Sequence, residues 1–210
     1  MKESDVIDYL LNLGFSEIKI SKIRSYVDLL LIFNNKYNLI GKNTEKEVWS
    51  RHVLDSAQLI KFIDFKDNHI LSDFGSGAGL PGFIISVAND NPKFHVKLYE
   101  KSPVKRAFLR DIKKISNFVI EKNVLDYKNI KTNYVVCRAF KKLGAIFEIS
   151  REKIKNPHKL IILKGKNAIQ ELKSLPNLQD YRYKTVDSIT ESDSKIIIAE
   201  KNEKKNNCSD

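Results

Sequence analysis

One short segment constrains the fold of this chain more than any other: the run DFGSGAGLPG at residues 73–82. It follows a short apolar run and leads into an apolar stretch with helical spacing. Glycines allow positive φ and let the backbone approach a ligand where a Cβ would collide. Pro81 suits the first turn of a helix, because the N–H that proline lacks has no partner there. A glycine loop between a strand and a helix is the context of a nucleotide-binding turn, so we expect this loop to bind a nucleotide-like ligand.

The chain around this loop predicts a sheet. From His69 onward, short apolar runs alternate with helical stretches, which is typical of a mostly parallel, doubly wound α/β fold. The last two apolar runs are separated only by the polar turn TESDS at residues 190–194, so they predict an antiparallel pair that closes a seven-stranded sheet. The expected strands are residues 69–74, 94–100, 118–123, 133–140, 159–165, 181–189 and 195–201, and the expected helices are residues 81–89, 103–115, 143–154 and 168–172.

The N-terminal third of the chain shows no strand pattern and predicts helices. Gly14 is expected to stop the first helix, and Ser21 is expected to cap the second. Thr44, with Glu47 three residues on, has the form of a capping box that opens a third helix. We divide the chain into an N-terminal helical extension (residues 1–68), an α/β domain (residues 69–200) and a frayed polar tail (residues 201–210).

Composition narrows the choice of partners. Lysine and arginine (37) exceed aspartate and glutamate (26), which gives a net charge of +11. Nucleic acid is the first candidate partner and an anionic membrane surface the second. The alternative is that the base composition of the genome favours Lys, Asn and Ile codons, in which case the lysines alone account for the charge. No run approaches the ~20 apolar residues of a membrane-spanning helix, and the N-terminus does not resemble a signal peptide. Cys137 and Cys208 predict neither a disulfide framework nor a metal site. We therefore expect a cytoplasmic monomer without a membrane partner.

Two cofactor classes fit the glycine loop. Gly77, Gly79 and Gly82 satisfy the G-x-G-x-x-G pattern of dinucleotide enzymes. Asp73, however, lies two residues before Gly75, the first glycine of the loop, where a carboxylate can pair with a methionine ammonium and would repel a pyrophosphate. The loop also starts at Gly75, and Asp-x-Gly-x-Gly-x-Gly is the signature of class I methyltransferases. We therefore favour S-adenosyl-L-methionine as the cofactor.

An acidic residue at the end of the second expected strand indicates that the ligand contains a nucleoside. It does not distinguish a dinucleotide from S-adenosyl-L-methionine. Glu100 ends that strand, where a carboxylate can accept hydrogen bonds from ribose hydroxyls.

Several flanking motifs occur in one order along the chain. They are Asn38-Leu39-Ile40, Arg51-His52-Val53-Leu54-Asp55-Ser56, the Gly75–Gly82 loop with its Leu-Pro-Gly ending, Arg138-Ala139-Phe140 and Leu163-Lys164-Gly165. Over residues 36–200 this combination resembles the glucose-inhibited division protein B family, the bacterial 16S rRNA guanine-N7 methyltransferases. The resemblance implies a Rossmann-like class I methyltransferase fold with an N-terminal helical extension. It also implies a guanine of the decoding-centre stem-loop in the small ribosomal subunit as the target.

The resemblance further implies cofactor contacts, and three positions depart from the family pattern. The implied contacts are made by Gly75, Leu80, Val124, Leu125 and Arg138. Asn123 and Leu125 stand where many members carry Arg and Glu, which leaves backbone contacts possible and puts any arginine side-chain role in doubt. Asn133 stands where the family usually has Asp before the fourth strand.

Three residues are candidates for binding the substrate. Arg51 is either a solvated charge or a contact to RNA, and His52 is either a half-buried structural histidine or a neighbour of the substrate pocket. Lys164 ends an expected central strand, at the edge where ligands bind in open α/β sheets. We assign no catalytic base, because guanine N7 has a lone pair and no proton to lose.

Other functions stay open from the sequence alone. The acceptor can be another molecule, such as a tRNA, a protein or a small molecule, on the same fold. The chain can also be a nicotinamide-dependent oxidoreductase or an RNA-binding module without activity. A basic helix is more typical of a solvated face than of a specific RNA groove; its cations are Lys105, Arg106, Arg110, Lys113 and Lys114.

Overall fold

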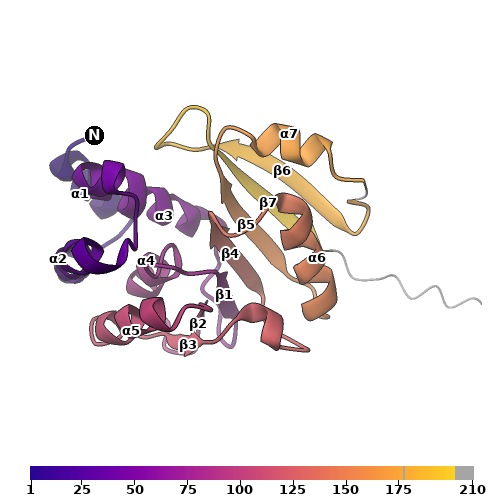
Figure 1. The fold of residues 1–210 in the computed structure, drawn as a ribbon, viewed down its shortest axis with the longest axis horizontal. Coiled ribbons are helices and arrows are strands. Elements are labelled where there is room, and N and C mark those ends of the chain that lie inside the picture. Colours follow the sequence, from indigo (N-terminus) through magenta and orange to yellow (C-terminus); the bar gives the residue numbers. More distant parts are fainter. Residues whose placement is uncertain (177, 202–210) are drawn as a thin grey trace, which may run out of the picture.

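A computed structural model describes residues 1–176 and 178–201 of the chain. The described residues build a seven-stranded sheet in the order β3-β2-β1-β4-β5-β7-β6 (Figure 1). Strands β1 to β5 run parallel, whereas β7 is antiparallel to both of its neighbours. This confirms the predicted α/β class and the closing antiparallel pair. The strands are β1 (Ile70–Phe74), β2 (His95–Tyr99), β3 (Val119–Glu121), β4 (Tyr134–Arg138), β5 (Lys159–Lys164), β6 (Tyr181–Asp187) and β7 (Lys195–Lys201).

The strand order reverses between β1 and β4. From β1 the chain moves outward to β2 and β3, then returns to the other side of β1 with β4. Ligands of open α/β sheets bind at such a reversal, outside the carboxyl ends of the strands. β1 ends at Phe74, directly before the glycine loop, and β4 ends at Arg138. The topology therefore brings the loop and Arg138 to the same edge of the sheet.

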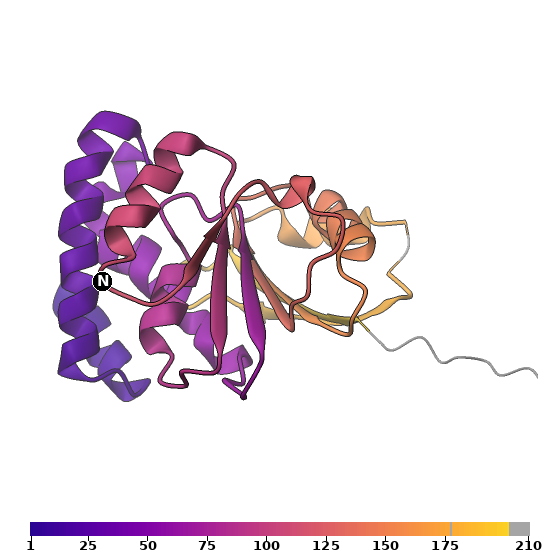
Figure 2. The ribbon, with the colours of Figure 1, turned by 90° about the horizontal axis from the view of Figure 1, so that it is seen from below.

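Helices cover both faces of the sheet (Figure 2). Along β4, Val136 belongs to the apolar cluster on one face, while Val135 and Cys137 belong to the cluster on the other. Strands buried on both sides need apolar residues at successive positions, which explains the short unbroken apolar runs. One face carries α4 (Gly82–Ala88) and α5 (Pro103–Ile112); the other carries η4 (Val124–Asp126), α6 (Leu143–Lys153) and α7 (Ala168–Lys173).

The N-terminal extension begins with two helices, α1 (Glu3–Asn12) and α2 (Glu17–Tyr37). Gly14 follows α1 with φ +88°, which confirms it as the stop. The prediction of Ser21 as a cap was wrong: Ser16 caps α2, and its hydroxyl accepts a hydrogen bond from the Lys19 N–H at 3.4 Å. Ile20, fully buried one position before Ser21, explains the difference, because its burial extends the helix toward the N-terminus.

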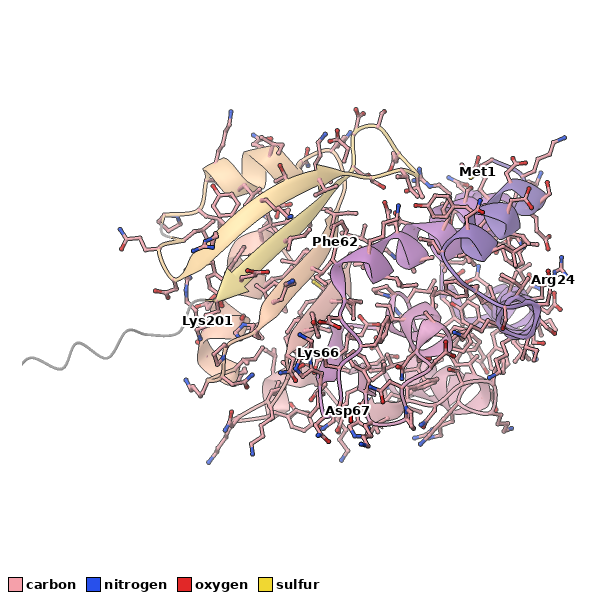
Figure 3. The ribbon with its side chains drawn as sticks, turned by 180° about the vertical axis from the view of Figure 1, so that it is seen from behind. Met1, Arg24, Phe62, Lys66, Asp67 and Lys201 are labelled. Carbon is pink, nitrogen blue, oxygen red and sulfur yellow. The ribbon has the colours of Figure 1, made fainter. Side chains whose placement is uncertain are left out.

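The third predicted helix is irregular. It consists of η1 (Lys42–Glu47), η2 (Trp49–Leu54), α3 (Asp55–Ala57) and η3 (Gln58–Phe62), of which η1 and η3 are 3₁₀ and η2 is a π-helix. The predicted capping box was wrong, because the Thr44 side chain lies inside η1 and hydrogen-bonds to Gly41 and His52. In Figure 3 the last helical segment of the extension ends at Phe62, and the connection through Lys66 and Asp67 leads to β1.

The extension shares a hydrophobic core with the α/β domain. Val6 and Leu30 of the extension belong to the same apolar cluster as Phe108 of α5 and Phe83 of α4. The ring of Tyr26 stacks on Phe83 with centroids 4.3 Å apart. Residue 69 therefore marks a change of secondary structure within one continuous core.

Further expectations from the sequence concern the polar tail, the cysteines, membrane-spanning helices and metal sites. Residues 202–210 of the expected polar tail, with Cys208, lie outside the described residues. Within the described part, Cys137 is a free, buried thiol of β4. No helix there is long and apolar enough to cross a membrane, and no three His, Cys, Asp or Glu side chains of that part gather as metal ligands.

Candidate functional site

The glycine loop leaves β1 with three glycines at positive φ: Gly75 (+73°), Gly77 (+57°) and Gly79 (+88°). A Cβ on Gly75 would lie 2.3 Å from the Phe140 ring, and one on Gly79 would lie 2.9 Å from Ile112. At Gly77 the nearest atom is the Gly75 carbonyl oxygen, 3.9 Å away. Gly75 and Gly79 are therefore required by packing, whereas the space beside Gly77 is open for a ligand.

Asp73 lies under the loop and is fully buried. Its Oδ2 accepts a hydrogen bond from the Gly82 N–H at 2.9 Å, which ties the loop to the start of α4. Among the described residues no donor reaches its other carboxylate oxygen, Oδ1. Burial raises the pKa of Asp73 to about 7, although the Gly82 N–H, the nearby Ser76 hydroxyl and the charge of Arg138 oppose the rise. A cation at Oδ1 would complete the hydrogen bonding of this carboxylate and stabilise its charge.

Glu100 follows β2 and is also buried. Its Oε2 accepts from the Gly77 N–H at 2.8 Å and its Oε1 from the Ser102 N–H at 2.7 Å. The carboxylate therefore lies against the open space at Gly77, with a second lone pair on each oxygen for a hydroxyl group.

The other expected cofactor residues differ in exposure. Val124 is buried, and Leu125 is exposed. Asn123 accepts from the Leu125 N–H at 3.3 Å, so the asparagine supports the backbone of η4. Leu80 is buried, and its N–H donates to the Ser76 carbonyl oxygen, which stabilises the loop.

The departure at Asn133 keeps a hydrogen-bonding role. Its Oδ1 accepts from the Ile70 N–H at 2.9 Å, a bond that a carboxylate oxygen would accept equally. This asparagine therefore fixes the start of β1 beside β4.

Arg138, at the end of β4, points toward the N-terminal extension. Its guanidinium donates to the Arg51 carbonyl oxygen at 2.9 Å and to His52 Nδ1 at 2.8 Å, and it lies 3.4 Å from Asp55 Oδ2. Two residues on, Phe140 packs against Gly75. The Arg138–Ala139–Phe140 segment thus connects the extension to the glycine loop.

The hydrogen bonds of His52 determine its tautomer. An arginine only donates, so Nδ1 must accept, and the ring proton is on Nε2. Nε2 then donates to the Thr44 hydroxyl at 2.8 Å, which donates to the Gly41 carbonyl oxygen at 2.7 Å. Burial, with the charges of Arg138 and Arg51, lowers the pKa of His52 to about 3. His52 is therefore neutral at physiological pH, and its one ring lone pair is engaged.

A cavity of about 570 Å³ lies beside Arg138 and Ala139. Its remaining lining comes from residues 39–55 of the extension, residues 163–171 at the end of β5, and residues 190–194 between β6 and β7. The structure therefore brings all three substrate candidates, Arg51, His52 and Lys164, to one cavity.

Two ion pairs line this cavity in addition to Arg138–Asp55. Lys164 Nζ is 2.8 Å from Glu171 Oε1, and Arg51 Nη1 is 2.8 Å from Glu191 Oε1. Each cation is thus held in place by a carboxylate: Glu191 lies far from Arg51 along the chain, whereas Glu171 is seven residues after Lys164. Neither Glu171 nor Glu191 was a candidate from the sequence.

Sequence reasoning also missed a contact behind the glycine loop. The buried Tyr26 hydroxyl of α2 donates to the Ala78 carbonyl oxygen at 3.0 Å. Its position among the apolar residues of α2 indicated burial, but nothing in the sequence indicated which backbone atom it would reach.

Comparison with known proteins gives one family. A family model described as rRNA small subunit methyltransferase G matches residues 19–202. A protein of Pelagibacter ubique is 35% identical over 188 residues, covering 86% of this chain and 88% of that relative. A protein of Rickettsia bellii is 36% identical over 180 residues, covering 85% and 91%. Both are named ribosomal RNA small subunit methyltransferase G.

A solved structure shares the fold at low sequence identity. Aeropyrum pernix fibrillarin, crystallised with natively bound S-adenosyl-L-methionine, matches with a TM-score of 0.54 at 15% identity. The match covers 71% of this chain and 75% of that chain. At this identity the likeness shows the fold alone.

Proposed function

The chain belongs to the rRNA small subunit methyltransferase G family, and on this premise we propose that it methylates N7 of a guanine in 16S rRNA with S-adenosyl-L-methionine. The observation that carries the proposal is a pair of spaces on either side of the segment Arg138–Phe140, whose Arg138 and Ala139 line the cavity and whose Phe140 packs against Gly75. One is the open space at Gly77, and the other is the cavity beyond Arg138, which is lined in part by charged side chains.

The residues around Gly77 fit the cofactor. Asp73 Oδ1, which has no donor among the described residues, suits the methionine ammonium, and Glu100 suits the ribose hydroxyls. Leu125 offers an exposed apolar surface for the adenine ring, beside the buried Val124. Bound S-adenosyl-L-methionine supplies a methyl group made electrophilic by its positive sulfur.

The cavity fits a target base without a catalytic base. Guanine N7 has a lone pair and no proton, so nothing has to be removed in the transition state. His52, the natural candidate for a base, gives its ring lone pair to Arg138. The work of Arg138 and His52 is then to hold the cavity wall in place, which contributes alignment of the reacting atoms.

We further propose that the protein acts on the small ribosomal subunit as a cytoplasmic monomer. Its net charge of +11 favours association with rRNA phosphates.

A methylation assay tests this function. Small subunits from cells that lack the enzyme are incubated with the protein and labelled cofactor, and N7-methylguanine is mapped in the rRNA at nucleotide resolution. One new N7-methylguanine in 16S rRNA is expected. Label in tRNA or protein alone would reassign the acceptor, and calorimetric binding of NAD instead of S-adenosylhomocysteine would reject the methyltransferase.

A further inference from the structure

The turn between β6 and β7 is part of the cavity wall. Thr190, Glu191 and Ser194 line the cavity, although the turn lies far along the chain from the extension opposite. The turn is anchored there by Gln58, whose Nε2 donates to Ser188 Oγ at 3.0 Å and whose Oε1 accepts from the Ile189 N–H at 3.0 Å.

A second anchor lies beside the first. The Thr190 hydroxyl donates to Asp55 Oδ1 at 2.8 Å, and the same oxygen accepts from Gln58 Nε2 at 2.9 Å. The position of the turn is therefore determined before a substrate arrives.

Glu191 is the most accessible of the three carboxylates that line the cavity. Its side chain is 44% exposed, against 24% for Glu171 and 15% for Asp55. Glu171 holds Lys164 and the Leu143 N–H, which places its oxygens at the start of α6. Glu191 therefore combines a held position with the most accessible carboxylate of the three.

The open carboxylate is held from both sides. Oε1 pairs with Arg51, and Oε2 accepts from the Ser194 hydroxyl at 2.8 Å. Each oxygen keeps further acceptor capacity. The hydrogen bonds of Arg51 and Ser194 lower the pKa of Glu191, so the side chain is an anion that only accepts at neutral pH.

Guanine presents a complementary edge. Its N1–H and 2-amino group donate side by side, and O6 beside them accepts; adenine and the pyrimidines lack this order. A carboxylate takes the two donors, and the guanidinium paired with it offers a donor for O6. N7 is not part of this edge and stays free to react.

We propose that Glu191, paired with Arg51, selects guanine as the target base by accepting from its N1–H and 2-amino group. This inference rests on the proposed function, because it assigns the specificity of the same site. The turn at residues 190–194 is then a recognition element.

Inosine provides the test, since it lacks only the 2-amino group of guanosine. Reassembled small subunits carry 16S rRNA with guanosine or inosine at the target position, and kcat/KM for methylation is measured on each. Wild-type protein should prefer guanosine by about 10- to 100-fold, the range of a hydrogen bond to a charged group. The preference should shrink in Glu191→Gln and approach unity in Glu191→Ala.

Asp187 provides the matched control. It lies on the same hairpin, pairs with Lys195, is 81% exposed and is not part of the cavity lining. Asp187→Ala should keep the full preference for guanosine. A Glu191→Ala protein that keeps the wild-type preference for guanosine would overturn the inference. If kcat/KM also falls equally on both substrates, Glu191 only anchors the turn. Failure of wild-type protein to methylate guanosine N7 would instead reject the proposed function.

Discussion

Gly77 has free space beside its Cα, whereas Gly75 and Gly79 lie against neighbouring side chains. We expect Gly77→Val to weaken S-adenosylhomocysteine binding by about 100-fold, because a side chain inserted into the space that the ligand occupies costs about 1–3 kcal/mol. Calorimetry measures the affinity.

A matched control separates this effect from backbone strain. Gly14 also has positive φ, and no atom of the described residues lies within 4 Å of a Cβ built there. Gly14→Val should cost similar stability in a thermal melt while leaving the affinity unchanged. Normal binding by a folded Gly77→Val protein would remove Gly77 from the cofactor site.

Asp73 predicts a pH-dependent affinity. Its pKa of about 7 in the free protein should fall when a ligand ammonium reaches Oδ1. Binding then favours the carboxylate, so S-adenosylhomocysteine affinity is full above pH 7 and weakens as the pH falls below 7, by up to about tenfold per unit.

Calorimetry in buffers of different ionisation enthalpy should show that binding releases a proton at pH 6 and none at pH 8. Asp73→Asn keeps an acceptor for the Gly82 N–H and should bind weakly at every pH. An affinity of wild-type protein that stays flat from pH 5.5 to 8 would place the ammonium elsewhere.

At the scale of elements, the irregular segment 42–62 is held to β4 mainly through Arg138 and His52. Because His52 is neutral with its lone pair engaged, single-turnover methylation at saturating cofactor and RNA should vary little between about pH 6.5 and 8.5, where an operative histidine would titrate. His52→Ala should slow the step without introducing or removing a pH dependence.

One result for His52→Ala would contradict the absence of a catalytic base. A loss of a thousandfold or more in His52→Ala, with cofactor and RNA affinity intact and a wild-type pH dependence abolished, would show that the reaction needs a base. Thr44→Val is the companion variant, since it removes the acceptor of the ring N–H and should have a smaller effect than His52→Ala.

For the whole molecule, the shared core predicts one cooperative unit. The single tryptophan, Trp49, lies in the extension, whereas the far-ultraviolet circular dichroism reports on all helices and strands. Denaturant unfolding followed by both signals should give coincident transitions. An earlier fluorescence transition would show that residues 1–68 unfold as a separate domain.

The net charge of +11 predicts how RNA binding responds to salt. RNA affinity should fall steeply with salt, and each phosphate contact should contribute about 0.7–0.9 to the logarithmic slope. Lys166→Ala should lower the slope, since this lysine is exposed at the cavity and its removal leaves the Lys164 and Arg51 ion pairs intact. Lys22→Ala, an exposed position of α2, serves as the control, and a slope near zero would attribute the charge to codon bias.

Local chemistry is sufficient to specify the glycine loop and the sheet. Positive φ at Gly75, Gly77 and Gly79 needs glycine, and strands buried on both faces need unbroken apolar runs, so loop and sheet could be predicted from residue order. The motifs likewise identified the family.

Which side chains meet depends on long-range contacts that appear only in the folded chain. The tautomer of His52 depends on Arg138, and Glu191 joins the cavity through Arg51, pairs that lie far apart in the chain. The caps expected at Ser21 and Thr44 failed for the same reason, because burial of Ile20 and the bond to His52 outweighed the local pattern. Long-range packing and hydrogen bonding contribute more free energy at these positions than the local preference of a cap does, and no short segment of sequence records them.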